Sequence, residues 1–110
     1  MPYQGTPWIR NNLLKQPGQQ AIAVGSSAWF AWLQNATTFC YHSPTTYTRV
    51  TLRKEKRRHQ FYWYAYLKRD LKLHNIYVGK TETLTAARLQ QVADTLMTKA
   101  RRSQLPIGDG

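Results

Sequence analysis

The run Gln60-Phe61-Tyr62-Trp63-Tyr64-Ala65-Tyr66-Leu67 is the most aromatic stretch of this 110-residue sequence, and it predicts a β-strand. Aromatic residues pack well on the pleated, half-buried surface of a sheet. Because side chains alternate along a strand, the run presents two different faces. The apolar face holds Phe61, Trp63, Ala65 and Leu67, and the face of rings with polar ends holds Gln60, Tyr62, Tyr64, Tyr66 and Lys68. We therefore expect the first face to bury a core and the second to meet a partner.

The segments on either side of this run predict two hairpins. Residues 47–54 alternate in polarity and lead through a basic tip at residues 54–59 into the aromatic strand. A second turn is expected at residues 68–70, followed by a last strand over residues 71–78 that ends at Gly79. Residues 38–42 predict a short extra strand, which a turn at residues 43–46 connects to the first hairpin. The central part of the chain is therefore expected to be a three-stranded antiparallel meander with a short extra strand.

Two helices are expected around this meander. Ser26 or Ser27 is a plausible N-cap for a short helix over residues 28–34, and Asn35 is its expected end. Thr83 or Thr85 is the expected cap of a long final helix. Its apolar positions follow the 3.6-residue period at Leu89, Val92, Ala93, Leu96 and Ala100. The small side chain of Ala65 would let this helix approach the apolar face of the central strand closely.

The predicted fold class is α+β, with a three-stranded antiparallel sheet packed on the C-terminal helix. Residues 1–24 contain three of the five prolines and no steady period, so we expect an irregular N-terminal arm. The short helix, the sheet and the long helix would form one domain over residues 25–102. Residues 103–110 are expected to be a flexible tail.

The charge of the sequence favours a polyanionic partner. Its formal net charge is +11, from 16 lysines and arginines against 5 acids. Nucleic acid is the commonest partner of this kind, and an anionic membrane surface is the main alternative. The sequence contains no apolar run of the roughly 20 residues that span a bilayer, and its first residues lack the pattern of a signal peptide. We therefore expect a cytoplasmic, nucleoid-associated protein that does not act on a membrane.

The candidate nucleic-acid-binding residues lie in the most basic part of the sequence. Residues 49–80 contain ten lysines and arginines and two acids, a net charge of +8. Cations at the hairpin tips could hold phosphates, whereas side chains in the middle of the open face could meet base edges. The predicted contacts are Arg49, Thr51, Arg53, Lys54, Lys56, Arg57, Arg58, Tyr62, Tyr64, Tyr66, Lys68, Arg69, Lys72, Asn75, Tyr77 and Lys80.

Other interpretations of the same residues remain open. The tyrosines could pack beneath the first helix, whose Trp29 and Trp32 need cover, or they could stack on unpaired bases. The five acids show no pair suited to acid and base catalysis, so we expect no enzymatic activity. The three histidines have no ligand-like spacing with Cys40, so we expect no metal and no other cofactor. Cys40 is expected to be a small core residue.

Four short motifs carry a resemblance to known DNA-binding domains. They are Val50-x-Leu52-Arg53-Lys54-Glu55, Tyr62-Trp63-Tyr64-Ala65-Tyr66, Ile76-Tyr77-Val78-Gly79-Lys80-Thr81 and Leu84-Thr85-x-x-Arg88-Leu89. Together they are similar to the N-terminal arm-type domain of tyrosine integrases, whose architecture plant ethylene-response-factor domains share. Residues 28–33 with the following meander also resemble the N-terminal segment of some large bacterial LuxR-type regulators. The resemblance covers about residues 28–98, and it implies a three-stranded sheet that inserts its open face into the major groove.

These observations favour a non-catalytic protein that binds duplex DNA through its basic, tyrosine-rich sheet. Such a protein would be a transcriptional regulator or an accessory factor of a mobile element or recombination system. The alternative is a small basic subunit of an assembly with RNA or single-stranded DNA. A protein partner could bind the N-terminal arm or the first helix, and the sequence leaves the oligomeric state open.

Overall fold

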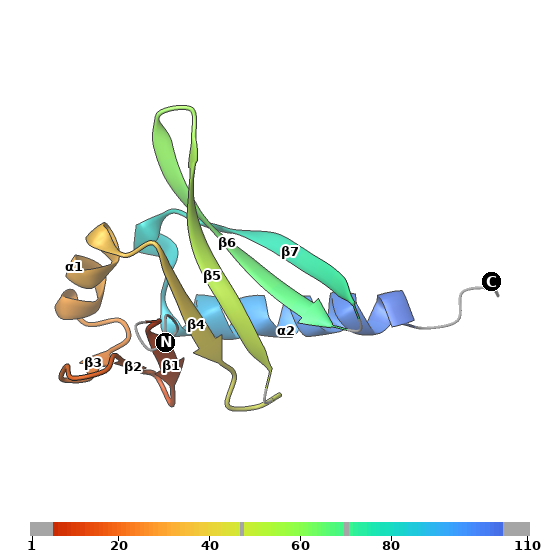
Figure 1. The fold of residues 1–110 in the computed structure, drawn as a ribbon, viewed down its shortest axis with the longest axis horizontal. Coiled ribbons are helices and arrows are strands. Elements are labelled where there is room, and N and C mark those ends of the chain that lie inside the picture. Colours follow the sequence, from red (N-terminus) through yellow and green to blue (C-terminus); the bar gives the residue numbers. More distant parts are fainter. Residues whose placement is uncertain (1–5, 47, 70, 105–110) are drawn as a thin grey trace.

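The computed structural model describes residues 6–46, 48–69 and 71–104, which form a mixed sheet of seven strands with two helices (Figure 1). The fold is α+β, as the sequence predicts, but the sheet is not three-stranded. The elements are β1 (Trp8–Arg10), β2 (Leu13–Lys15), β3 (Ile22–Ala23), α1 (Ser27–Asn35), β4 (Thr38–His42), β5 (Arg49–Arg57), β6 (Gln60–Arg69), β7 (Lys72–Gly79), the 3-10 turn η2 (Thr81–Thr83) and α2 (Ala86–Gln104).

The expected N-terminal arm is the main error in the predicted fold. The strand order in the sheet is β3-β2-β1-β4-β5-β6-β7, so residues 8–24 supply three of its strands. Strands β4 to β7 form the predicted antiparallel meander, and β4 is the short extra strand. Strand β1 pairs with β4 in parallel, with Trp8 opposite Cys40 and Ile9 opposite Tyr41. Pairing with β1 therefore extends the meander on the side away from β7.

The turn between β1 and β2 explains how so short a segment forms a hairpin. Asn11 and Asn12 both have positive φ, 55° and 61°, which is the conformation that a two-residue type I′ turn requires. Asparagine tolerates the left-handed region better than most residues. The turn sets Arg10 opposite Leu13 and Ile9 opposite Leu14, and both Ile9 and Leu14 are fully buried. The apolar residue in the middle of each short strand thus anchors the hairpin in the core.

Both helices begin where the sequence predicts a cap. The Ser26 hydroxyl accepts a hydrogen bond from the Trp29 amide, and the Thr85 hydroxyl accepts one from the Arg88 amide. Helix α1 ends at Asn35, as expected. Helix α2 continues to Gln104, beyond the predicted boundary at residue 102, and residues 105–110 of the expected tail lie outside the described part. No helix in the described ranges is long and apolar enough to cross a bilayer.

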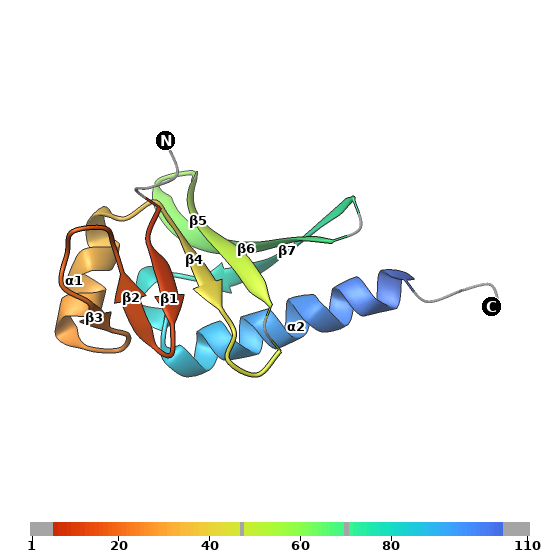
Figure 2. The same cartoon turned by 60° about the horizontal axis from the view of Figure 1, so that its bottom comes forward.

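The core lies between the helices and one face of the sheet, which we call the helix face (Figure 2). Strand register aligns Phe39, Leu52, Ala65 and Ile76 in one row across β4 to β7. Ala65 is fully buried, and α2 packs on both β6 and β7, which confirms the expected place of this small side chain under the final helix. The apolar face predicted for the aromatic run is confirmed at Trp63, Ala65 and Leu67, whereas Phe61 lies beyond the core and is exposed.

Helix α2 also protects the outer edge of the sheet at β7. The Arg88 guanidinium donates to the Val78 carbonyl at 3.0–3.1 Å and to the Tyr77 carbonyl at 3.2 Å. The Lys99 ammonium donates to the Asn75 carbonyl at 3.0 Å. Open edge carbonyls would otherwise invite pairing with another chain, so these two cations stabilise the helix and block the edge.

The hairpin boundaries differ slightly from the predicted ones. Strand β5 extends to Arg57 and pairs it with Gln60, so the first tip is only residues 58 and 59. Arg58 has a φ of 62° in this turn. Arg69 pairs with Lys72, so β6 continues one or two residues beyond the expected start of the second turn. Tyr47, the expected start of the first meander strand, and Asp70 lie outside the described residues.

Candidate nucleic-acid interface

The second face of the sheet, which we call the open face, carries the predicted polar and aromatic residues. Register places Thr51 beside Tyr66 and Asn75, and Arg53 beside Tyr64 and Tyr77. None of these side chains is buried. No helix of the described chain contacts this face, because the core-facing residues of α1 and α2 belong to the cluster on the helix face. The tyrosines therefore do not pack beneath the first helix.

The predicted contact residues divide between the two faces. Alternation and pairing place ten of them on the open face: Arg49, Thr51, Arg53, Arg57, Tyr62, Tyr64, Tyr66, Lys68, Asn75 and Tyr77. Lys80 joins this group, because its ammonium lies 6.0 Å from the centre of the Tyr62 ring. Lys54, Lys56, Arg69 and Lys72 lie on the helix-face side of their strands, and Arg58 lies in the hairpin turn. The structure thus brings together most of the predicted set, but not all of it.

Lys54 stabilises the protein's own structure in this fold. Its ammonium donates to the carbonyls of Leu33 at 2.8 Å and Gln34 at 3.2 Å, in the last turn of α1. A cation is favourable at this end of a helix, where carbonyls lack intrahelical partners. The ammonium also lies 5.4 Å from the centre of the Trp63 ring, and partial burial lowers the pKa of Lys54. Lys54 therefore acts as a C-terminal cap for α1.

Replacing Lys54 by Met should distinguish its role as a cap of α1 from the phosphate contact that the sequence predicts. Methionine keeps an apolar stem over Trp63 but removes both hydrogen bonds to α1, so we expect a loss of about 1 kcal/mol in the free energy of unfolding. Denaturant unfolding measures this loss, and Lys68→Met, at an exposed position of β6, is the matched control. If the chain binds DNA as the sequence predicts, the salt dependence of that binding should be the same for the variant and the unmodified protein. A change by a full unit would instead place Lys54 on a phosphate.

A two-stranded β-ribbon projects from one end of the open face. The pairing of β4 with β5 ends at Thr38 and Arg53, and the pairing of β7 with β6 ends at Gly79 and Trp63. Beyond these points, residues 55–62 pair only with each other, and Figure 1 shows this hairpin rising above the other strands. We call residues 55–62 the ribbon. It carries three cations, Lys56, Arg57 and Arg58, against the single acid Glu55, and all three cations are exposed.

Glu55 orders the basic side chains of the ribbon. Its carboxylate accepts hydrogen bonds from the Tyr66 hydroxyl and from the Arg57 guanidinium. The Tyr66 bond is the main cause that lowers the pKa of Glu55, and the same bond raises the pKa of Tyr66. The guanidinium of Arg57 lies 5.1 Å from the centre of the Tyr64 ring, and that of Arg53 lies 5.7 Å from the centre of the Tyr66 ring. The two arginines are thus restrained over tyrosine rings.

Three tyrosines continue the open face towards β7. The centre of the Tyr77 ring lies 5.9 Å from that of Tyr62 and 5.6 Å from that of Tyr64. These distances are typical of aromatic pairs. Tyr77 is half exposed. The rings therefore form a continuous aromatic surface next to the ribbon, on which a sugar or a base could rest.

The part of the open face that β1 and β4 supply was not predicted from the sequence. Because Trp8 and Arg10 alternate with the buried Ile9, they share a face with Cys40 and His42. With Thr6, Thr38, Arg49 and Thr51 they line a hollow of about 800 Å³. Cys40 is half-buried in this hollow, so its prediction as a core residue is wrong by one step of the alternation. The signal available in the sequence was Asn11-Asn12, a hairpin turn between two short apolar segments.

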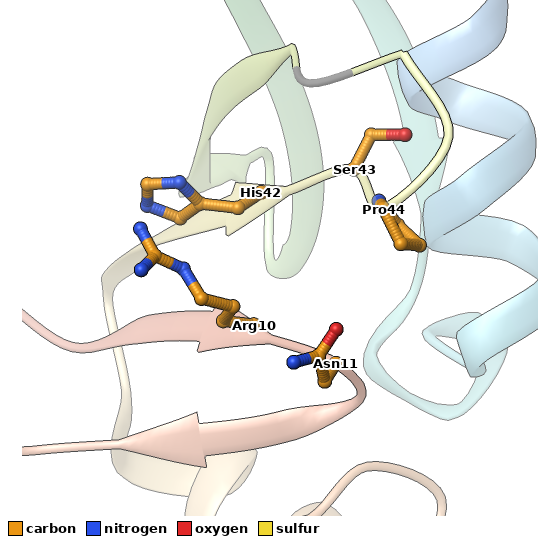
Figure 3. Close-up of a pocket in the computed structure, with 5 residues that line it drawn as sticks. All are labelled: Arg10, Asn11, His42, Ser43 and Pro44. Atoms are coloured by element: carbon orange, nitrogen blue, oxygen red, sulfur yellow. The ribbon is translucent and has the colours of Figure 1, made fainter.

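Arg10 and His42 form the basic wall of a second, adjoining hollow of about 520 Å³. Figure 3 shows their side chains extending from neighbouring strands, with Asn11, Ser43 and Pro44 completing the lining. His42 pairs across β4 and β5 with Arg49, so it has an arginine on each of the two neighbouring strands, Arg10 on β1 and Arg49 on β5. Desolvation lowers the pKa of His42, and the charges of Arg10 and Arg49 lower it further.

Comparison of the chain with family models, with curated proteins and with solved structures gives no match. The resemblance to arm-type DNA-binding domains thus stays a prediction.

Proposed function

We propose that this chain is a non-catalytic protein that binds duplex DNA, as a transcriptional regulator or as an accessory factor of a recombination system. The observation that carries the proposal is the basic ribbon at residues 55–62, which pairs with no other strand and stands clear of the sheet. Its three exposed cations and the arginines on the open face supply the contacts to phosphate that dominate affinity for DNA.

The width of the sheet decides which part of it could enter a groove. Strands lie about 4.8 Å apart, so seven strands span about 29 Å between the outer strand axes. The major groove is about 12 Å wide and admits a two-stranded ribbon. The ribbon's three residue pairs extend about 10 Å, more than the groove's depth of about 8.5 Å. The ribbon, rather than the whole sheet, is therefore our proposed groove element.

The rest of the open face would then lie along the backbone of the duplex. Lys68 and Lys80 are exposed and have no acidic partner in the described ranges. Arg53 and Arg49 are restrained within β5, and such restraint favours bidentate contact of a guanidinium with a backbone phosphate. The tip arginine Arg58 is suited to phosphate contacts, which position a protein without reading sequence.

Salt dependence tests this proposal directly. With about five phosphate contacts, the logarithm of the association constant should fall with the logarithm of salt concentration with a slope of roughly −4 to −5. Fluorescence anisotropy on a labelled duplex between about 50 and 200 mM salt measures the slope. An affinity that does not change over this range would contradict the proposal.

A second candidate function follows from the aromatic surface. Trp8, Tyr62, Tyr64, Tyr66 and Tyr77 all lie on the open face, and rings on a sheet can stack on unpaired bases. The chain would then be a basic subunit of an assembly with RNA or single-stranded DNA. Competition of duplex, single-stranded DNA and RNA of equal length separates the two functions. A single strand that outcompetes the duplex at every salt concentration would favour the second.

A further inference from the structure

We propose that Arg10, His42 and Arg49 form a binding site for a phosphate group of the nucleic-acid backbone, in the hollow over β1, β4 and β5. The assignment of this phosphate to nucleic acid rests on the proposed function, whereas the anion site itself does not. It concerns a part of the open face that the ribbon does not include.

The geometry brings three basic side chains together from three strands. Arg49 lies opposite His42 in the pairing of β5 with β4. Arg10 is the next residue of β1 after Ile9, which pairs with Tyr41 of β4. Its guanidinium lies beside the His42 imidazole (Figure 3). All three side chains line the hollow of about 800 Å³, together with Thr6, Thr38 and Thr51. The Thr38 hydroxyl donates to the Leu52 carbonyl, which leaves Thr6 and Thr51 as the hydroxyl donors for an anion. Guanidinium groups and hydroxyls are the donors that proteins use for phosphate oxygens.

The cluster has no counter-charge in the described chain. Neither Arg10 nor Arg49 has a hydrogen-bond acceptor or an acidic partner among residues 6–46, 48–69 and 71–104. The charged groups that face His42 are Arg10 from β1 and Arg49 from β5, and Cys40 is the other titratable group on this part of β4. Like charges held together cost free energy that an anion would offset. The arrangement is therefore complementary to a tetrahedral oxyanion.

Binding at this site should be linked to the protonation of His42. Desolvation and the two arginines lower the pKa of His42, so the imidazole is largely neutral above neutral pH. An anion between the three groups favours the charged imidazolium and raises that pKa, so binding takes up a proton. By linkage, the anion must bind more tightly as the pH falls.

Sulfate is the sharpest first probe, because its charge stays constant between pH 5.5 and 7.5. We expect sulfate to bind roughly two- to fivefold more tightly at pH 5.5 than at pH 7.5, the range for one partly exposed ion pair. NMR titration of the His42 imidazole should show its midpoint rising with sulfate, relative to chloride at equal ionic strength. Arg49→Gln should weaken binding, and His42→Gln should remove the pH dependence. An unchanged His42 midpoint would overturn the proposal.

Two further measurements identify the source of the phosphate and test this proposal separately from the proposal for the ribbon. The variant Arg57→Gln/Arg58→Gln should bind sulfate as the unmodified protein does, because both changes lie outside the hollow. Inorganic phosphate and a DNA duplex are then compared on Arg49→Gln. If the site holds backbone phosphate, this variant lowers the duplex salt slope by about one unit. Loss of binding to inorganic phosphate with an unchanged duplex slope would overturn the assignment to nucleic acid.

Discussion

Replacing Arg57 and Arg58 together by Gln should weaken duplex binding roughly 50- to 100-fold at 0.1 M salt. Each phosphate contact on B-DNA contributes a slope of about −0.9, so each contributes about eightfold at this concentration relative to 1 M salt. Both side chains are exposed at the end of the ribbon, Arg57 in its last residue pair and Arg58 in the turn, so both can reach phosphates. The salt slope should therefore become less steep by about two units, on preferred and scrambled duplexes alike.

The matched control is Arg101→Gln/Arg102→Gln. These two arginines are also exposed and adjacent, but they lie in the last turns of α2. The control changes the net charge of the protein by the same amount, so it corrects for the general electrostatic attraction to DNA. Equal losses in both double variants would show that net charge alone drives binding, and the ribbon would lose its proposed role.

The pattern of the central sequence was sufficient for the meander and both helices because these features depend on local chemistry. Alternation along residues 60–67 separates the buried Trp63 and Ala65 from the half-exposed Tyr64 and Tyr66. The caps at Ser26 and Thr85 are local hydrogen bonds to amides three residues later. Such signals lie within a few residues of sequence, which is why they could be predicted without a structure.

The N-terminal strands could not be predicted in the same way. Their strands are two or three residues long, too short for a period to be visible. Strand β1 joins the sheet by pairing in parallel with β4, which lies about 30 residues later in the chain. The hollow with Arg10, His42 and Arg49 depends on this long-range pairing, so its members could not be grouped from their spacing.

Lys54 shows a second limit of sequence reasoning. It belongs to the most basic segment, and its charge alone favours a contact with nucleic acid. The structure places it on the helix face, where its ammonium donates to the Leu33 and Gln34 carbonyls. Because side chains alternate along a strand, the sequence indicates that Lys54 lies on the opposite face from Arg53 and Glu55. Only the position of α1 in the structure identifies the carbonyls that accept its hydrogen bonds.

Trp29→Ala should cause the largest loss of stability, about 3–5 kcal/mol in the free energy of unfolding. Trp29 is fully buried, and its ring centre lies 5.5 Å from that of Phe39 and 5.7 Å from that of Trp32. Its indole N–H donates to the Leu84 carbonyl at 2.8 Å, which connects α1 to the segment before α2. Truncation leaves both a cavity and a buried carbonyl without this donor, and each adds to the cost.

Trp32→Ala is the control for this prediction, because Trp32 lies on the same helix but is only partly buried. Its indole N–H donates to the Gln16 side chain at 3.3 Å rather than to a buried carbonyl. We expect the smaller loss at Trp32, measured by urea unfolding with unchanged m-values. A small domain has only about 5–15 kcal/mol of stability, so Trp29→Ala should also lower the melting temperature strongly. Equal losses at the two positions would mean that the full burial of Trp29 and its hydrogen bond to the Leu84 carbonyl add nothing to the stability that partial burial already gives at Trp32.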